Sequence, residues 1–480
     1  MQIPIIGPIY QHSSRDVNYQ RCINLRVADA GPQGRGQDQV GVLITTPGLT
    51  SICTATGKTQ VRAIINFNDS SLYCVVDATV YKVTFNEDAL TATLASLGTI
   101  STSTGPVKWA INPTQIILVD GSATGYIITP SSDVLAAIAD GDFTGGVTVD
   151  FLDSYFLYNT PNASTMFSTA INDGTDINAL DVATAEGAPD KLVGIAVNKR
   201  ELWAFGKHTT EIWYDAANAT GFPLSRRDGA WIDIGCSSAY SIVKVANGLC
   251  WLDDRGLVVF ADGYEPAIIS TPAIGREIGS YKVISDAIGT TYIDRGHVFY
   301  EITFPTQSKT WAFDFMTKQW HERAQWTQDD EFGRHVSNCI TRWKNFTLVG
   351  GYNTGKLYIQ SPDYYDDAGD PIHRLRTTFH VHQEFMLLSI DALELHLEAG
   401  KGLVSGTGSD PQIMMRTSND GGYTWSNELS RSLGTIGEYS TSVRWNHLGA
   451  AREWLFEFRF TDPIPFTLIE ASADIKPSSN

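Results

Sequence analysis

The sequence predicts an all-β protein: a β-propeller of about six or seven blades, an extended N-terminal arm and a C-terminal antiparallel β-sandwich. Three observations carry this prediction. A unit of short apolar strands recurs seven times, at intervals of 42 to 50 residues, which is a period typical of propeller blades. A segment with many chain breakers precedes the repeats, and long segments of alternating apolar and polar residues follow them.

Residues 1–60 contain few alternating runs and several breakers, among them Pro4, Gly7 and Pro8. Breakers of this kind interrupt regular elements, so the segment offers no periodic face of its own to bury. We therefore expect an extended arm that packs on another part of the assembly.

Residues 61–360 hold the seven repeats, which begin near residues 61, 107, 149, 193, 243, 290 and 338. Each repeat orders an apolar inner strand, a polar turn, an aromatic-bearing strand, a second turn and a third strand. These strands are rich in Val, Ile, Thr, Tyr, Phe and Trp, which suit a pleated, half-buried surface. Helical periodicity is almost absent, and residues 132–139 are the best helix candidate. The repeats predict the propeller.

An acidic loop with Asp363, Asp366, Asp367 and Asp370 interrupts the repeat pattern, and we place a domain boundary there. Its spacing does not match a calcium-binding loop, and no glutamate follows at the bidentate position. We interpret it as a solvated linker. Residues 361–480 follow this loop. Apolar and polar residues alternate there, as in residues 454–460, so that one face of each strand is buried and the other faces solvent, which predicts the sandwich.

Composition narrows the function classes. The formal net charge is −18, and the longest basic group is Arg226-Arg227. Phosphate binding requires clustered Lys and Arg, so general affinity for nucleic acid is not expected. The six cysteines are scattered without a C-x-x-C pair, which indicates reduced, buried thiols. No apolar stretch reaches the length of a membrane helix, and the first residues lack the pattern of a secretory signal.

The sharpest local motif lies outside the repeats. It fits S-x-D-x-G-x-T-W, the Asp box of sialidase-type propellers, with Ser418, Asp420, Gly422, Thr424 and Trp425. Asp and Gly define the turn of such a hairpin, while Thr and Trp anchor the next strand. Only one box is present, so we interpret it as structural. His380 and His382 share one face of a strand, but no third ligand with defined spacing accompanies them, so no metal site is predicted.

The N-terminal segment resembles a known family. Residues 10–13 (YQHS), 18–25 (NYQRCINL) and 43–49 (LITTPGL) are similar to the opening of the packaged-DNA stabilisation proteins, which form the tail hub, or nozzle, of short-tailed bacteriophages. Residues 194–214 and 418–468 are similar too, so the resemblance spans nearly the whole chain. It implies docking roles for Asn18, Gln20, Cys22, Asn24, Pro47, Gly48 and Leu49. Residues 26–28 depart from the family's usual continuation, which leaves the partner of the arm open.

Members of that family are structural and non-catalytic, and the resemblance implies the same here. It implies a homo-hexamer in the virion tail, assembled in the host cytoplasm without a cofactor. The ring would lie below the portal-adaptor (head completion) protein and receive tail needle and tailspike or fibre proteins. Packaged double-stranded DNA would pass through its channel without specific binding, because carboxylates repel phosphates. The loop with Asp363, Asp366, Asp367 and Asp370 is one candidate for a lumen or gate loop.

Two other function classes stay open at the level of sequence. One is a propeller glycosidase or carbohydrate-binding module that uses the Asp-box hairpin. The other is a propeller scaffold for protein interactions within a cell. Propellers host enzymes, lectins and scaffolds alike, so the repeat alone does not choose between these classes.

Overall fold

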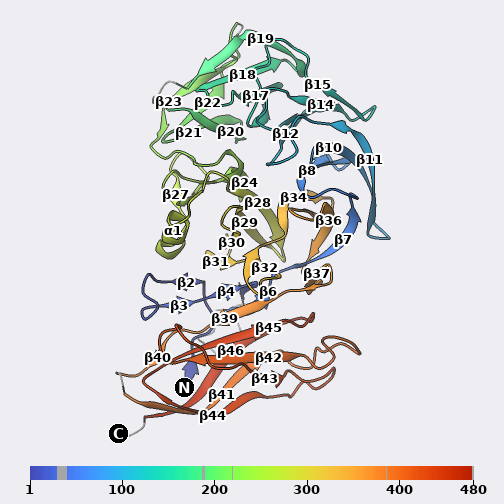
Figure 1. Ribbon diagram of the computed structural model, residues 1–480. Helices are drawn as coiled ribbons and strands as arrows, with labels where there is room; N and C mark the ends of the chain where they lie inside the picture. Colours follow the sequence, from blue (N-terminus) through green and yellow to red (C-terminus); the bar gives the residue numbers. More distant parts are fainter. Residues whose placement is uncertain (30–40, 186–189, 219, 385, 478–480) are drawn as a thin grey trace.

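The computed structural model describes residues 1–29, 41–185, 190–218, 220–384 and 386–477. The molecule is elongated, with the propeller at one end and the sandwich at the other (Figure 1). No helix of these residues is long and apolar enough to span a membrane. The all-β prediction of a propeller followed by a sandwich is confirmed.

Seven four-stranded antiparallel blades form the propeller in the described residues. The first three blades are built in sequence order. Their strands are β8 (Val61–Phe67), β9 (Ser71–Val76), β10 (Thr79–Asn86) and β11 (Thr91–Thr99); β12 (Lys108–Ile111), β13 (Ile116–Val119), β14 (Tyr126–Thr129) and β15 (Val134–Ala137); β16 (Val149–Leu152), β17 (Tyr155–Asn159), β18 (Thr165–Ala170) and β19 (Asp173–Thr184).

The next three blades repeat this order, and the 3-10 helix η1 (Ala239–Ser241) precedes the fifth. Their strands are β20 (Leu192–Asn198), β21 (Glu201–Gly206), β22 (Thr210–Asp215) and β23 (Leu224–Ile232); β24 (Val243–Val245), β25 (Gly248–Leu252), β26 (Val258–Ala261) and β27 (Ala267–Ile268); β28 (Ile288–Asp294), β29 (His297–Phe304), β30 (Lys309–Asp314) and β31 (Gln319–Glu322).

The seventh blade takes its fourth strand from the N-terminal segment. It contains β34 (Ser337–Trp343), β35 (Phe346–Gly351) and β36 (Lys356–Ser361), and β36 pairs antiparallel with β7 (Gly48–Thr54). The innermost strand β34 packs against β8 of the first blade, which closes the circle. Residues 48–54, expected in an extended arm, are therefore part of the propeller, because they complete the edge that β36 leaves open.

One continuous sheet joins the propeller to the sandwich. The short strand β4 (Cys22–Ile23) pairs in parallel with β31 of the sixth blade and antiparallel with β39 (Arg374–Thr377). The sheet continues from β39 through β45 (Glu453–Phe460) and β42 (Gln412–Ser418) to β43 (Leu429–Ser432), and β40 (Val381–His382) pairs with β45. A two-residue strand of the N-terminal segment thus links both domains.

The second sheet of the sandwich has the order β44-β41-β46-β6-β5, and β1 also pairs with β46. Two of its strands, β5 and β6, form an N-terminal hairpin, so residues 1–60 are distributed over several sheets. The bounds are β1 (Gln2–Ile3), β5 (Leu25–Asp29), β6 (Gly41–Thr45), β41 (Leu388–Leu397), β44 (Val443–Ala451) and β46 (Thr467–Pro477).

Small hairpins complete the structure between and beside the two domains. They are β2 (Tyr10–Gln11) with β3 (Tyr19–Gln20), β32 (Ala324–Trp326) with β33 (Phe332–Arg334), and β37 (Asp366–Asp367) with β38 (Asp370–Pro371). The largest buried apolar cluster contains Trp320 of the sixth blade and Phe458 of the sandwich. The two domains therefore share one core.

The helix prediction for residues 132–139 is wrong. This segment contains the outer strand β15, which pairs with β14. One apolar turn is too short to be stable as a helix, whereas pairing satisfies its backbone. The one α-helix of the described residues, α1 (Pro272–Gly279), was missed. Thr271 caps it by accepting a hydrogen bond from Ile274 N at 3.3 Å, and Pro272 occupies the first turn, both recognisable start signals.

Candidate functional site at the junction of propeller and sandwich

Asn24 lies where the sixth blade, the closing strand and the sandwich meet. Its Nδ2 donates to the carbonyls of Ala324 at 2.7 Å and His373 at 2.8 Å, and its Oδ1 accepts from Ala324 N at 2.9 Å. Its backbone N–H donates to Glu322 O, and its carbonyl accepts from Thr46 N. The φ of 53° is a conformation that asparagine adopts more readily than most residues. Asn24 is a hub of the junction.

The residues just before Asn24 contact a buried arginine of the sandwich. Gln20 Oε1 accepts from Arg376 Nη2 at 3.2 Å, and Cys22 pairs with Arg376 across the sheet. Arg376 also donates from Nε to Ile5 O at 2.7 Å, so it holds two parts of the N-terminal segment. Burial raises the pKa of the Cys22 thiol. Asn18 accepts from Gln20 N at 3.1 Å and shapes the turn that precedes it.

Pro47, Gly48 and Leu49 lead into the closing strand. The Pro47 carbonyl accepts from Arg323 Nη2 at 3.0 Å, and Leu49 is fully buried. Gly48 has no room for a side chain, because a Cβ there would lie 2.4 Å from Asp366 O. The seven residues singled out by the resemblance therefore have contacts within this chain; their docking to another protein stays a prediction.

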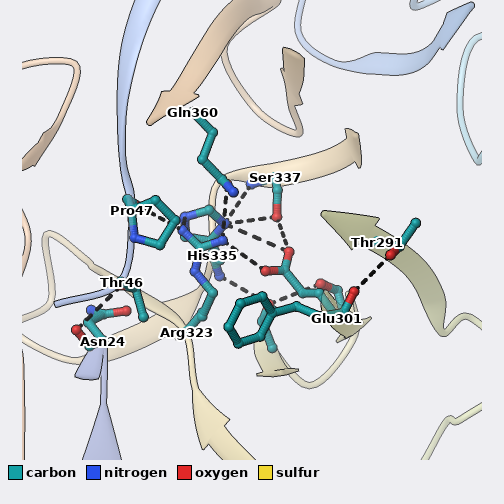
Figure 2. A network of polar contacts seen from close by, with 12 residues as sticks. Asn24, Thr46, Pro47, Thr291, Glu301, Arg323, His335, Ser337 and Gln360 are labelled. Atoms are coloured by element: carbon teal, nitrogen blue, oxygen red, sulfur yellow. Dashed lines mark hydrogen bonds and ion pairs between the residues drawn. The ribbon is translucent and has the colours of Figure 1, made fainter. Parts of the chain in front are cut away.

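A buried ionic network connects the sixth and seventh blades (Figure 2). Arg323 Nη1 donates to Glu301 Oε2 at 3.0 Å and to Gln360 Oε1 at 3.1 Å. Arg323 Nη2 donates to His335 Nε2 at 2.9 Å, so the imidazole accepts there and donates from Nδ1 to Ser337 Oγ at 2.8 Å. Ser337 Oγ donates in turn to Glu301 Oε1 at 2.5 Å.

The environment of this network keeps His335 neutral. Burial, together with the positive charge of Arg323, places the pKa of His335 well below its usual range. A neutral imidazole can accept from the guanidinium, whereas a protonated one would repel it. The side chains of Arg323 and Glu301 are both about 1% exposed. The network therefore locks the two blades together in the interior.

The acidic loop forms the hairpin of β37 and β38 on the outer edge of the seventh blade. Asp367 pairs with Leu49, whereas Asp363 and Asp370 are exposed. Burial raises the pKa of Asp367 to about 7, although Arg323 and Arg374 partly oppose that shift. The loop lies away from the centre of the propeller, and its role as a lumen or gate loop stays a prediction.

The Asp-box residues use their polar atoms within one turn. Asp420 accepts from the backbone N–H groups of Tyr423 and Thr424 and from Thr424 Oγ1 at 2.6 Å. Ser418 Oγ donates to Asp420 and accepts from Gly422 N at 2.9 Å. These hydrogen bonds lower the pKa of Asp420 to about 2.

The same turn holds the N-terminal hairpin. The Arg15 guanidinium lies over the rings of Tyr19 and Tyr423, at 5.0 and 5.2 Å from their centroids, and donates to Gly422 O at 3.2 Å. The ring of Trp425 lies under Arg416 at 4.9 Å. The box thus anchors β2 and β3 on the sandwich.

One of the two histidines that the sequence singles out has a carboxylate partner. His380 Nδ1 contacts the Glu453 carboxylate. Among the residues that the structure describes, no group of three or more His, Cys, Asp or Glu side chains is arranged to hold a metal ion. All six cysteines are free thiols.

Sequence reasoning missed the buried charges that hold the junction together. A signal was available, because lone charged residues stand inside apolar runs: Glu301 interrupts a buried strand, and Arg374 and Arg376 alternate with Leu375. Such residues are almost never fully buried unless they are paired. The partners of these charged residues come from distant segments. The sequence pattern therefore indicates that each buried charge has a partner, but it does not identify which residue that partner is.

Comparisons with known proteins agree with this two-domain arrangement. The family described as Bacteriophage P22 Gp10, beta-propeller, matches residues 1–338, and Bacteriophage P22 Gp10, beta-sandwich, matches residues 373–476. No curated protein sequence matches the chain.

Solved structures that resemble the chain share little sequence with it. The WD40 β-propeller domain of Doa1 is 9% identical over 65% of this chain and 96% of its own, with a TM-score of 0.41. The extracellular domain of BT4673 from B. thetaiotaomicron is 8% identical over 65% and 39%, with 0.44. The computationally designed Ika8 protein is 12% identical over 65% and 99%, with 0.36. Both Gp10 families match the chain, in the order propeller and then sandwich. The chain therefore belongs to the bacteriophage P22 Gp10 family of phage stabilisation proteins, which are virion proteins.

Proposed function

We propose that this chain is a structural, non-catalytic subunit of the tail hub, or nozzle, of a short phage tail. In this proposal it continues the DNA channel below the portal and its adaptor, retains packaged DNA and permits its ejection. The observation that carries the proposal is the way the N-terminal segment ties the two domains into one body through β4, β7 and the hairpin of β5 and β6.

A channel wall must keep its shape when densely packed DNA presses on it. Inter-domain contacts within a chain are often small and polar, which permits relative motion. Here a continuous ten-stranded sheet and a shared apolar core cross the junction. Arg376 and Asn24 add buried hydrogen bonds at the same place. Such a joint suits a rigid wall element better than a hinged binding module.

The charge of the chain suits a conduit. A formal charge of −18 disfavours adhesion of phosphates, because binding DNA requires Lys and Arg to replace its counterions. DNA would then pass without specific binding. In the assembly that we propose, six copies form a closed ring by meeting unlike patches on their neighbours, as heterologous contacts do. The adaptor lies above this ring, and needle and tailspike or fibre proteins lie below it.

The mass of the assembly tests this proposal. We expect the purified chain, alone or mixed with its adaptor, to form rings with a central channel in negative-stain images and a mass of six subunits. Each subunit has a mass of 52.6 kDa. A chain that stays monomeric in all conditions and forms no ring on the adaptor would contradict the proposal.

A charge reversal tests the lumen role of the acidic loop. Asp363 and Asp370 are exposed, so changing both to lysine leaves the fold intact. If the loop faces the channel, virions carrying the double variant eject DNA more slowly at low salt, and added salt restores the rate. The matched control changes Asp88, exposed on the first blade, and Glu265, exposed on the fifth blade, to lysine. Equal ejection rates for both variants would remove the loop from the lumen.

A further inference from the structure

A cavity of about 490 Å³ lies at the centre of the propeller, and residues of all seven innermost strands line it. Its charged lining residues are Arg62, Lys108, Asp150 and Lys244. Three cations and one carboxylate thus converge there, in a chain whose overall charge is −18. Lys244 pairs with Asp150, and Asp120 and Asp77 lie near Arg62, so the positive charge in excess at the cavity is that of Lys108.

Arg62 has its donors engaged by the protein. Its guanidinium donates to the carbonyls of Gly105, Asp77, Thr102 and Thr104 and to Thr102 Oγ1, at distances between 2.5 and 2.9 Å. A guanidinium has five N–H donors, so these bonds occupy all of them. Asp120 and Asp77 offset part of the charge of Arg62, and the guanidinium has no donor left for a ligand.

Lys244 and Asp150 form a pair on the cavity wall. Lys244 Nζ contacts both carboxylate oxygens of Asp150, at 3.0 and 2.7 Å. Asp150 also accepts from the backbone N–H groups of Phe151 at 2.9 Å and Val197 at 2.7 Å. The carboxylate is therefore held in place and largely satisfied. About half of the Lys244 side chain is exposed, at 54%, so solvent and small solutes reach this part of the cavity.

Lys108 has fewer partners than its charge calls for. Its ammonium has three donors, yet it makes a single hydrogen bond, to Ile242 O at 3.3 Å. The charged groups around it are Asp150 and Lys244, with the Cys236 thiol nearby. Burial lowers the pKa of Lys108 to about 8. The group is therefore mainly protonated at neutral pH, with donors available at the cavity surface.

We propose that the centre of the propeller binds a small oxyanion, of the phosphate or carboxylate class, whose oxygens accept hydrogen bonds from Lys108 and whose charge is balanced by the Lys108 ammonium. The volume is that of a small-molecule pocket, for which about 300–1,000 Å³ is usual. Double-stranded DNA does not fit such a volume. This site is therefore separate from the channel that the proposed ring forms between subunits. Anion binding at this site can be supported or contradicted whether or not the ring forms.

The test is a titration of the full chain with inorganic phosphate, sulfate and succinate at low ionic strength, followed by calorimetry. We expect saturable binding of one anion per chain, with a dissociation constant of ~1 mM or tighter. Lys108→Met weakens binding at least about tenfold, because a charge-assisted hydrogen bond is lost. The preferred anion among the three identifies the source of the oxyanion, and preference for any of them supports the site.

Two further variants serve as a control and as a substitute for the methionine variant. Lys476→Met removes a lysine that pairs with Asp391 on the sandwich, far from the cavity, and leaves binding unchanged. Lys108→Gln keeps a polar side chain and serves in place of the methionine variant if that variant misfolds. Sulfate binding to the unaltered chain weakens above about pH 8, as Lys108 loses its proton. Absence of saturable binding, or equal binding by the Lys108 variants, would overturn the proposal.

Discussion

Asn24 and Ala324, which are 300 residues apart, exchange two hydrogen bonds at the junction of the propeller and the sandwich: Nδ2 donates to the Ala324 carbonyl at 2.7 Å, and Ala324 N donates to Oδ1 at 2.9 Å. This pairing imitates the exchange between two backbone segments of a sheet. A single side chain thus continues the hydrogen-bond pattern where the strand β4 ends.

Replacing Asn24 tests how much that contact contributes to the stability of the chain. Asn24→Ala leaves the buried N–H and C=O of Ala324 and the C=O of His373 without partners. Each unsatisfied group costs roughly 1–3 kcal/mol, so we expect the free energy of unfolding to fall by at least about 3 kcal/mol. Urea unfolding followed by tryptophan fluorescence measures this loss. Asn18→Ala, which removes one turn contact, serves as the control and should cost less than about 1 kcal/mol.

Gly48 tests the closure of the propeller. A Cβ at this position would meet Asp366 O at 2.4 Å and Tyr364 O at 2.6 Å, so Gly48→Ala displaces β7 from its place beside β36. We expect faster amide hydrogen exchange in β7 and β36 and a loss of stability of about 2 kcal/mol or more. At Gly263, a Cβ meets nothing within 4 Å, so Gly263→Ala is the matched control and leaves exchange unchanged.

The ion pair of Arg323 and Glu301 tests the buried network through which the sixth blade contacts His335, Ser337 and Gln360. Glu301→Gln leaves the Arg323 charge uncompensated in the interior, which costs about 3–5 kcal/mol. Combining it with Arg323→Met removes that charge, so the double variant should lose less stability than the two single variants summed. The exposed pair of Arg200 and Asp153 is the control, and Asp153→Asn should cost under about 1 kcal/mol. Strict additivity would argue against coupling.

The stability of the chain should depend on pH through the buried groups His321, His335 and Asp367 and the half-buried His373. Burial lowers the pKa values of His321 and His335 well below their usual range and that of His373 to about 4, so these imidazoles take up protons only on unfolding. Their contribution to stability is lost as pH falls below about 6.5. Asp367 acts in the opposite sense, because its folded pKa of about 7 lies above its unfolded value.

The balance of these groups is measurable. Between about pH 5 and pH 6, three histidines take up protons on unfolding and Asp367 releases one, so this set takes up about two protons net. Thermal unfolding at several pH values gives that slope. Asp367→Asn should raise the uptake by about one proton and stabilise the chain near pH 8. An unchanged slope would show that Asp367 is ionised in the folded chain.

Local patterns were enough to predict most strands and their grouping. The seven repeats correspond to seven blades, and the alternation of residues 454–460 corresponds to a sandwich strand, because apolar alternation reports directly which face is buried. Ser418 to Trp425 form the turn that the motif predicts. Residues 132–139 led to a wrong helix prediction, because a short apolar run is compatible with either a helical turn or a short strand.

What the sequence by itself determined is which segments are strands, how many repeats they form, and that a sandwich follows the propeller. Only the tertiary structure decided that Gly48–Thr54 closes the seventh blade, that Cys22–Ile23 joins the sixth blade to the sandwich sheet, and that Glu301 meets Arg323. The physical reason is that strands pair through backbone groups, which are the same in every residue. A pattern therefore marks a strand and its buried face, while packing of the whole chain selects its neighbour.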